Sequence, residues 1–167
     1  MRWLSRLLGL KRAEEKQVLT LGDSPPWQLS CTRDLPLFLR ALKDWASENS
    51  VLYLEGVSTS GTIGDFLRQH PTKRTAAVAV GTIWPRPDIS HMEMNEENLE
   101  GLAMLAEHAA FPEIACHIHV YREDMLLLQW YDAPFDPILL SGSLAENDVR
   151  RLAERLGVTY VRMPPQS

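Results

Sequence analysis

Two histidines, His117 and His119, are separated by one residue in an apolar segment that is typical of a β-strand. Alternate residues of a strand point to the same face, so both imidazoles are expected on one face and Cys116 on the other. Two imidazoles and a carboxylate are a ligand set that divalent transition metals accept. We expect the carboxylate to come from Asp132, which makes these residues the candidate metal ligands and candidate acid–base catalysts.

That expectation depends on a hairpin between residues 114–121 and 126–132, joined by a short polar turn. If Arg122 faces Met125, His117 faces Trp130 and Asp132 is its diagonal neighbour. The alternative is a structural histidine pair that Trp130 half covers. One-residue spacing between histidines is a motif of low specificity, and no longer metalloenzyme signature accompanies it. The sequence therefore predicts no cofactor and leaves a divalent metal as an alternative.

A second candidate is a loop rich in hydroxyl groups that precedes a short helix. It consists of Ser58, Thr59, Ser60, Gly61 and Thr62. Unpaired backbone N–H groups at a helix start can bind a phosphate or a carboxylate. The loop lacks the lysine of a P-loop, and Thr62 with Asp65 also fits a capping box. Anion binding and helix capping are thus both open.

Asp132 and Asp136 form a third candidate, an acid–base pair in a stretch that also contains two prolines. General acid–base catalysis requires a cleft and shifted pKa values, neither of which a sequence reveals. Aspartate and proline at this spacing more often build turns.

A fourth candidate is the basic amphipathic arm, residues 1–12. Its apolar face comprises Trp3, Leu4, Leu7 and Leu8. Such a segment could contact an anionic membrane surface, a partner, or the domain itself. A helix of three turns is marginal alone, so membrane binding would be weak.

The expected elements place these candidates in one domain. Apolar spacing predicts helices near 34–47, 95–109 and 143–156, with Asn95 as a cap, a Ser143–Glu146 capping box and Gly157 at the last C-terminus. Strands are expected at 51–54, 75–84 as a central strand, 90–94 as an edge strand, 138–140 and 158–163.

We expect an α/β (α+β) fold, in which a mixed β-sheet containing the hairpin is flanked by three to four helices. Residues 13–30 are interpreted as linker or loop, 31–163 as a single domain and 164–167 as a tail.

The charge is unevenly distributed along the 167 residues. The whole chain carries −5, but the first twelve positions hold four of its 17 basic residues and no acidic one. The rest has 13 basic and 22 acidic residues, a formal charge of −9. Such a body repels nucleic acid and favours a basic partner. Cys31 and Cys116 form neither a C-x-x-C pair nor a zinc-finger spacing, and no segment has the length of a membrane span.

These observations favour a cytoplasmic, non-enzymatic module that binds another protein through an acidic surface. Two alternatives remain. The first is an enzyme or ligand-binding domain that uses the His117/His119 face with Asp132, or the loop from Ser58 to Thr62. The second is a peripheral protein of the inner membrane surface, anchored by residues 1–12.

Overall fold

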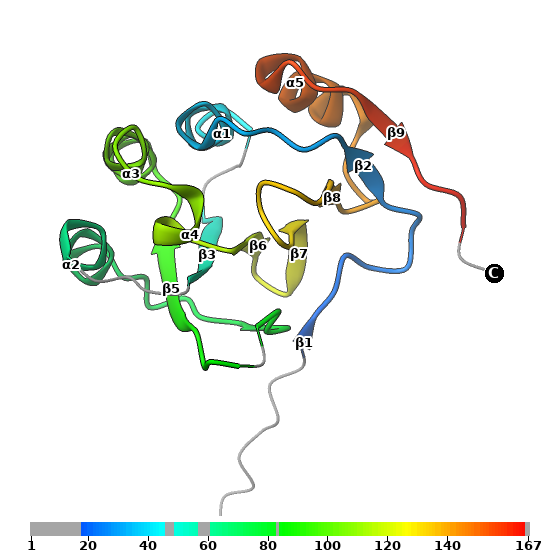
Figure 1. Cartoon of the computed structure of the whole chain (residues 1–167). Helices are drawn as coiled ribbons and strands as arrows, with labels where there is room; N and C mark the ends of the chain where they lie inside the picture. Colours follow the sequence, from blue (N-terminus) through cyan, green and yellow to red (C-terminus); the bar gives the residue numbers. More distant parts are fainter. Residues whose placement is uncertain (1–17, 46–48, 57–60, 83, 166–167) are drawn as a thin grey trace, which may run out of the picture.

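The computed structural model describes residues 18–45, 49–56, 61–82 and 84–165. The described strands and helices follow one another along the chain (Figure 1). They are β1 (Val18–Leu19), β2 (Trp27–Leu29), α1 (Leu35–Leu42), β3 (Val51–Gly56), α2 (Gly61–Gln69), β4 (Ala77–Val78), β5 (Asp88–Glu93), α3 (Glu96–Ala106), α4 (Phe111–Ile114), β6 (His117–Arg122), β7 (Met125–Trp130), β8 (Ile138–Leu140), α5 (Glu146–Leu156) and β9 (Tyr160–Arg162).

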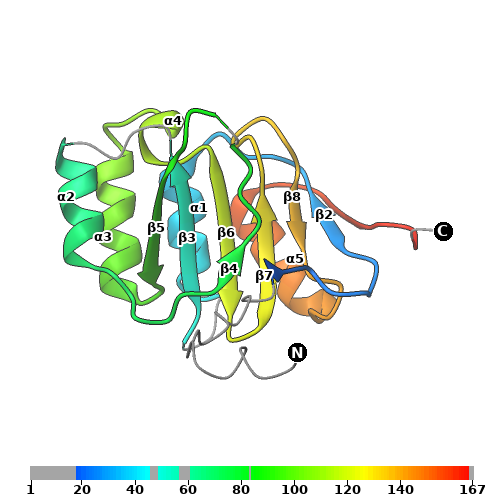
Figure 2. The same cartoon turned by 90° about the horizontal axis from the view of Figure 1, so that it is seen from below.

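The centre of the fold is a seven-stranded sheet in the order β5-β3-β6-β7-β8-β2-β9. Every neighbouring pair in this sheet is antiparallel. Helices α2, α3, α1 and α5 cover one face, and the short parallel pair β1–β4 lies on the other face (Figures 1 and 2). The α/β class and the β6–β7 hairpin are therefore confirmed.

The long helices begin where short polar side chains can cap them. Asp34 accepts the backbone N–H of Leu37 at the start of α1, and Asn95 accepts that of Asn98 at the start of α3. The predicted capping box at α5 is wrong. Ala145 precedes that helix without a side-chain cap, and the Ser143 hydroxyl contacts the Met125 sulfur instead. Gly157 ends α5 in the left-handed conformation, as predicted.

Alternation along the central strands creates two separate cores. Leu52 and Leu54 of β3 belong to the large core between the sheet and the helices. Val51 and Tyr53 of the same strand point the other way, into a small core that includes Leu19 of β1. Part of the face away from the helices is therefore also buried, beneath the chain segments that cross it.

Two sequence assignments are wrong. Residues 75–84 were expected to form a central strand, but among the described residues of this segment the strand β4 comprises Ala77 and Val78, which pair with β1 outside the seven-stranded sheet. A run of Ala and Val is typical of a strand that is buried on both faces. Here the segment instead crosses over the sheet, and Val80 is half exposed. Residues 13–30 were interpreted as linker or loop, yet Trp27–Leu29 forms β2 between β8 and β9. Three residues after two prolines give no periodic signal.

The start and the register of the hairpin also differ from the prediction. Residues Phe111–Ile114 form α4, so β6 begins only at His117. The pairing shifts by one position between Val120 and Tyr121, as in a β-bulge. His119 consequently faces Gln129, and Trp130 faces Ile118 rather than His117. Trp130 lies in the large core, so it does not cover the histidines.

No helix in the described part of the chain is both long enough and apolar enough to cross a membrane. The basic arm, residues 1–12, lies outside the described residues.

Candidate functional site

Two regions on the sheet face away from the helices could carry function: a buried polar cluster and an open groove. The polar cluster comprises Tyr53 and Glu55 of β3, His117 and His119 of β6, and Tyr131 after β7. Glu55 and His117 are directly opposite each other in the β3–β6 register. The Tyr131 ring makes T-shaped contacts with both imidazoles, at ring-centre distances of 5.2 Å and 5.0 Å, so Tyr131 takes the covering position predicted for Trp130.

Glu55 is fully buried, and all its described hydrogen-bond partners are donors. Its carboxylate accepts the backbone N–H groups of Gly81 and Thr82 and the hydroxyl of Tyr53, the last at 2.9 Å. Burial acts to raise the pKa of this carboxyl, but the hydrogen bonds from Thr82, Gly81 and Tyr53 outweigh it and hold the pKa below its ordinary value. Glu55 is thus a buried anion whose charge the surrounding donors satisfy.

The ring of His117 has both nitrogen atoms engaged. The backbone N–H of Asp132 donates to Nδ1 at 2.9 Å, so the imidazole proton is on Nε2. Nε2 donates to the Thr82 hydroxyl at 3.1 Å and lies 3.7 Å from the nearer Glu55 oxygen. A histidine that binds a metal or acts as a base through Nε2 normally donates from Nδ1. Since Nδ1 faces a donor, His117 is held in the opposite tautomer.

His119 is completely buried, and neither of its ring nitrogens has a partner among the described residues. The Tyr53 and Tyr131 rings lie about 5 Å from its ring centre. Burial lowers its pKa to about 4; the Glu55 charge opposes this shift, and His117 adds to it. His119 is therefore neutral at pH 7 and behaves as an aromatic core residue with two unsatisfied polar atoms.

The predicted metal set is not assembled. Asp132 meets His117 through its backbone N–H, while its side chain is 70 % exposed and its nearer carboxylate oxygen is 3.8 Å from Nδ1. Across the described residues, no three histidine, cysteine, aspartate or glutamate side chains are arranged to hold one metal ion. Sequence reasoning placed the right histidines on one face but missed Glu55, which comes from a strand far away in the sequence.

The other candidate sites from the sequence either form turns or lie wholly or partly outside the described residues. The backbone carbonyl of Asp132 accepts the N–H groups of Phe135 and Asp136, so these aspartates build a turn. Of the candidate anion loop, Ser58, Thr59 and Ser60 lie outside the described residues. Gly61 and Thr62 form the exposed first turn of α2, and Gly61 has a φ of +69°. Trp3, Leu4, Leu7 and Leu8 of the arm are likewise not described.

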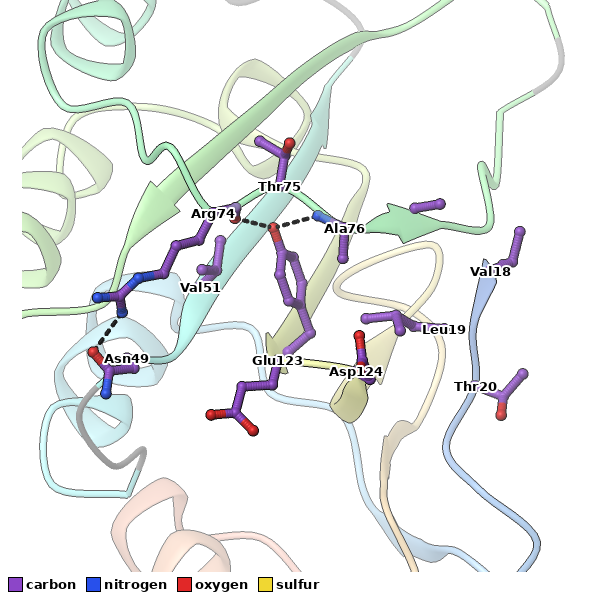
Figure 3. Close-up of a pocket in the computed structure, with 12 residues that line it drawn as sticks. Val18, Leu19, Thr20, Asn49, Val51, Arg74, Thr75, Ala76, Glu123 and Asp124 are labelled. Carbon is purple, nitrogen blue, oxygen red and sulfur yellow. Dashed lines mark hydrogen bonds between the residues drawn. The ribbon is translucent and has the colours of Figure 1, made fainter. Parts of the chain in front are cut away.

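The open region is a groove of about 810 Å³ at the end of the β6–β7 hairpin (Figure 3). Residues from β1, the strand ends and the segment after Arg74 line it. They are Val18, Leu19, Thr20, Asn49, Val51, Arg74, Thr75, Ala76, Ala77, Tyr121, Glu123 and Asp124. In Figure 3, Val18 and Thr20 lie on one side, Arg74 and Asn49 on the opposite side, and Glu123 and Asp124 between them at the hairpin turn.

The groove has an apolar floor and a polar rim. Leu19, Val51 and Tyr121 are buried and belong to the small core, so they give the floor a fixed shape. The Tyr121 hydroxyl accepts the N–H of Ala76 at 3.2 Å and donates to the carbonyl of Arg74 at 2.8 Å. The wall formed by residues 74–77 is thereby attached to the floor.

The rim carries more unpaired negative than positive charge. Glu123 and Asp124 are exposed, and neither has an ion-pair partner within the described ranges. Arg74, the one basic residue among the described residues that line the groove, hydrogen-bonds Asn49 and lies 3.7 Å from Glu93. A smaller cavity of about 210 Å³ adjoins the groove, shares Thr20 and Asp124 with it, and adds a third carboxylate, Asp23. The combined surface suits a cationic ligand.

Sequence reasoning missed the groove because its described lining residues come from four separate segments. Neither the groove nor the smaller cavity is lined by Glu55, His117 or His119. The one local signal is the adjacent pair of acids at the hairpin turn, which alone indicates only a turn.

Comparison with known proteins identifies no relative of this chain: no family model matches it, and neither does any curated protein or solved structure.

Proposed function

We propose that this chain is a protein-binding module that receives a basic, partly apolar segment of a partner in the groove. The observation that carries the proposal is the combination of a buried apolar floor with unpaired acidic residues on its rim. Protein interfaces commonly combine an apolar centre with a polar rim. Lysine or arginine side chains of the partner would pair with Glu123 and Asp124, while its apolar side chains would contact Leu19, Val51 and Tyr121.

The polar cluster gives less support to an enzyme. Catalytic groups need an unsatisfied donor or acceptor that faces a substrate. Glu55 and His117 instead form hydrogen bonds with neighbouring groups of the protein, such as the Gly81 N–H and the Thr82 hydroxyl. His119 has no exposed surface. Complementary charge speeds association and adds specificity without requiring any such group.

The test is binding of a synthetic peptide in which lysine and valine alternate, measured by titration calorimetry. We expect it to bind, and the matched peptide of glutamate and valine not to bind. Binding should weaken between about 0.05 M and about 0.5 M salt, because rim charges are screened. Glu123→Gln with Asp124→Asn should lower the affinity about tenfold.

The control variant combines Glu113→Gln with Asp136→Asn. It changes the net charge equally, at exposed positions that do not line the groove. Equal loss in both variants would show that overall charge, not the groove, attracts the peptide. No binding of the lysine peptide, or equal binding of both peptides, would contradict the proposal. A peptide of residues 1–17 tests the chain's own arm as a competing occupant.

A further inference from the structure

One continuous segment connects the polar cluster with the groove. This segment, residues 74–82 and here called the strap, crosses the sheet face opposite the helices (Figure 2). Its first residues, from Arg74 to Ala77, form a wall of the groove. Its last two residues, Gly81 and Thr82, rest on Glu55 and His117.

We propose that Glu55 is a positioning residue for the groove: its buried carboxylate fixes the strap, and the strap in turn holds the groove wall. The expected effect on binding rests on the proposed function. The attachment of the strap to Glu55 can be measured without any partner.

The contacts at the Glu55 end of the strap are specific. One carboxylate oxygen accepts the N–H of Gly81 at 3.0 Å and the other accepts the N–H of Thr82. Gly81 also lies directly on the His117 ring, since a Cβ there would be 2.6 Å from the ring's Cδ2. Only glycine allows this approach without displacing the strap or the imidazole.

The other end of the strap depends on Tyr121 and on apolar packing. The Tyr121 hydroxyl binds Arg74 and Ala76, and Ala76 and Val78 pack on the small core. The two ends, Arg74 and Thr82, are eight positions apart in the sequence, and β4 lies between them. Without the Glu55 contacts, this end of the strap would keep only the hydrogen bond between Thr82 and His117, so the wall would sample several positions.

The clamp depends on ionised Glu55. The titratable groups that face it are Tyr53 on its own strand, His117 and His119 on β6, and Tyr131; Asp132 lies beyond His117. The pKa of Glu55 is held below the ordinary value of 4.5, so the clamp is complete at neutral pH and is lost as the pH falls through the lowered pKa. Glu55→Gln keeps an acceptor for only one of the two strap N–H groups and presents an amide NH₂ to the other, so it should weaken the clamp at every pH.

The experiment follows the backbone amides of Gly81 and Thr82 by NMR in wild type, Glu55→Gln and Gly81→Ala. We expect Glu55→Gln to speed exchange of the Thr82 amide by about tenfold or more, and Gly81→Ala to do the same without changing a charge. The wild-type amide shifts should titrate with Glu55 at acidic pH, and those of Glu55→Gln should not. Tyr53→Phe is the matched control, because it removes a donor from the same carboxylate but leaves both strap contacts.

Peptide binding is then compared in the same variants. Both strap variants should bind the lysine–valine peptide about tenfold more weakly, while Tyr53→Phe should bind it as wild type does. Unchanged exchange in Glu55→Gln would overturn the clamp itself. Faster exchange with unchanged affinity would overturn the link to the groove. If no protein form binds the peptide, the proposed function fails, and the exchange data still decide whether Glu55 holds the strap.

Discussion

The polar cluster and the groove lie on the same sheet face but differ in what surrounds them. The cluster contains the residue types that usually carry chemistry, a glutamate and two histidines, yet its described polar contacts are internal and His119 has no exposed surface. The groove contains alanine, valine and threonine with two acids on its rim, and it is open (Figure 3). The search for chemically active residue types therefore led to the polar cluster, which has a structural role. The exposed cavity is the groove, which is formed by residue types that do not indicate a site.

The strap explains how the two regions are related. Charged groups are rarely buried unless a specific arrangement of partners satisfies them. Glu55 has such an arrangement, and it is provided by backbone N–H groups of the strap rather than by a ligand. The same segment then supplies one wall of the groove, so the buried region sets the shape of the exposed one.

The largest effect is expected from removing the buried carboxylate. Glu55→Ala should lower the free energy of unfolding by roughly 3 kcal/mol, because several donors lose their acceptor at once. Chemical denaturation measures the change, with Glu113→Ala as the control at an exposed glutamate. Equal stabilities of the two variants would mean that Glu55 contributes no more than a surface residue.

The next effect concerns His119 and pH. Unfolded imidazole takes up a proton near its ordinary pKa of 6.5, whereas buried His119 does so only near pH 4. The free energy of unfolding should therefore fall as the pH drops from about 6.5 toward 4, by about 2 kcal/mol at pH 5. His119→Phe should remove this pH dependence and change the free energy of unfolding little at pH 7, because it deletes two ring nitrogens that have no hydrogen-bond partner among the described residues. Parallel pH profiles of the two proteins would contradict the assignment of His119 as a sealed, neutral residue.

A smaller effect is expected from the arm. Deleting residues 1–12 should leave the melting temperature nearly unchanged and abolish any binding to anionic vesicles, since the arm holds the four basic residues that precede the acidic body. Vesicle co-sedimentation and thermal melting test both parts. Loss of solubility on deletion would instead show that Trp3 and its neighbouring leucines belong to the folded core.

No effect is expected from added zinc. His117 presents a proton rather than a lone pair at Nε2, so a metal would have to break the hydrogen bond from Asp132 or reorganise the cluster. The melting temperature should be the same with and without zinc, in wild type and in His117→Gln. Zinc-dependent stabilisation that His117→Gln abolishes would restore the metal interpretation.

Local patterns predicted the helices and the hairpin because those elements have local causes. Asp34 and Asn95 cap helices whose apolar residues repeat at helical spacing, and Ile138–Leu140 is a short apolar strand. Alternation likewise placed His117 and His119 on one face. The rest required information that no single segment contains. A one-residue register shift moved Trp130 away from the histidines, and the pairing of Glu55 with His117 joins residues 62 positions apart. The strap resembles a buried strand in composition but is held by contacts to distant residues.

The most direct test of the account is to map the lysine–valine peptide onto the protein by NMR. We predict that the shifted backbone amides are those of the groove, at residues 18–20, 75–77 and 121–124, with smaller changes along the strap and none at His119. Shifts centred on His117, His119 and Tyr131, with the groove unaffected, would contradict it and show that the polar cluster opens to receive the ligand.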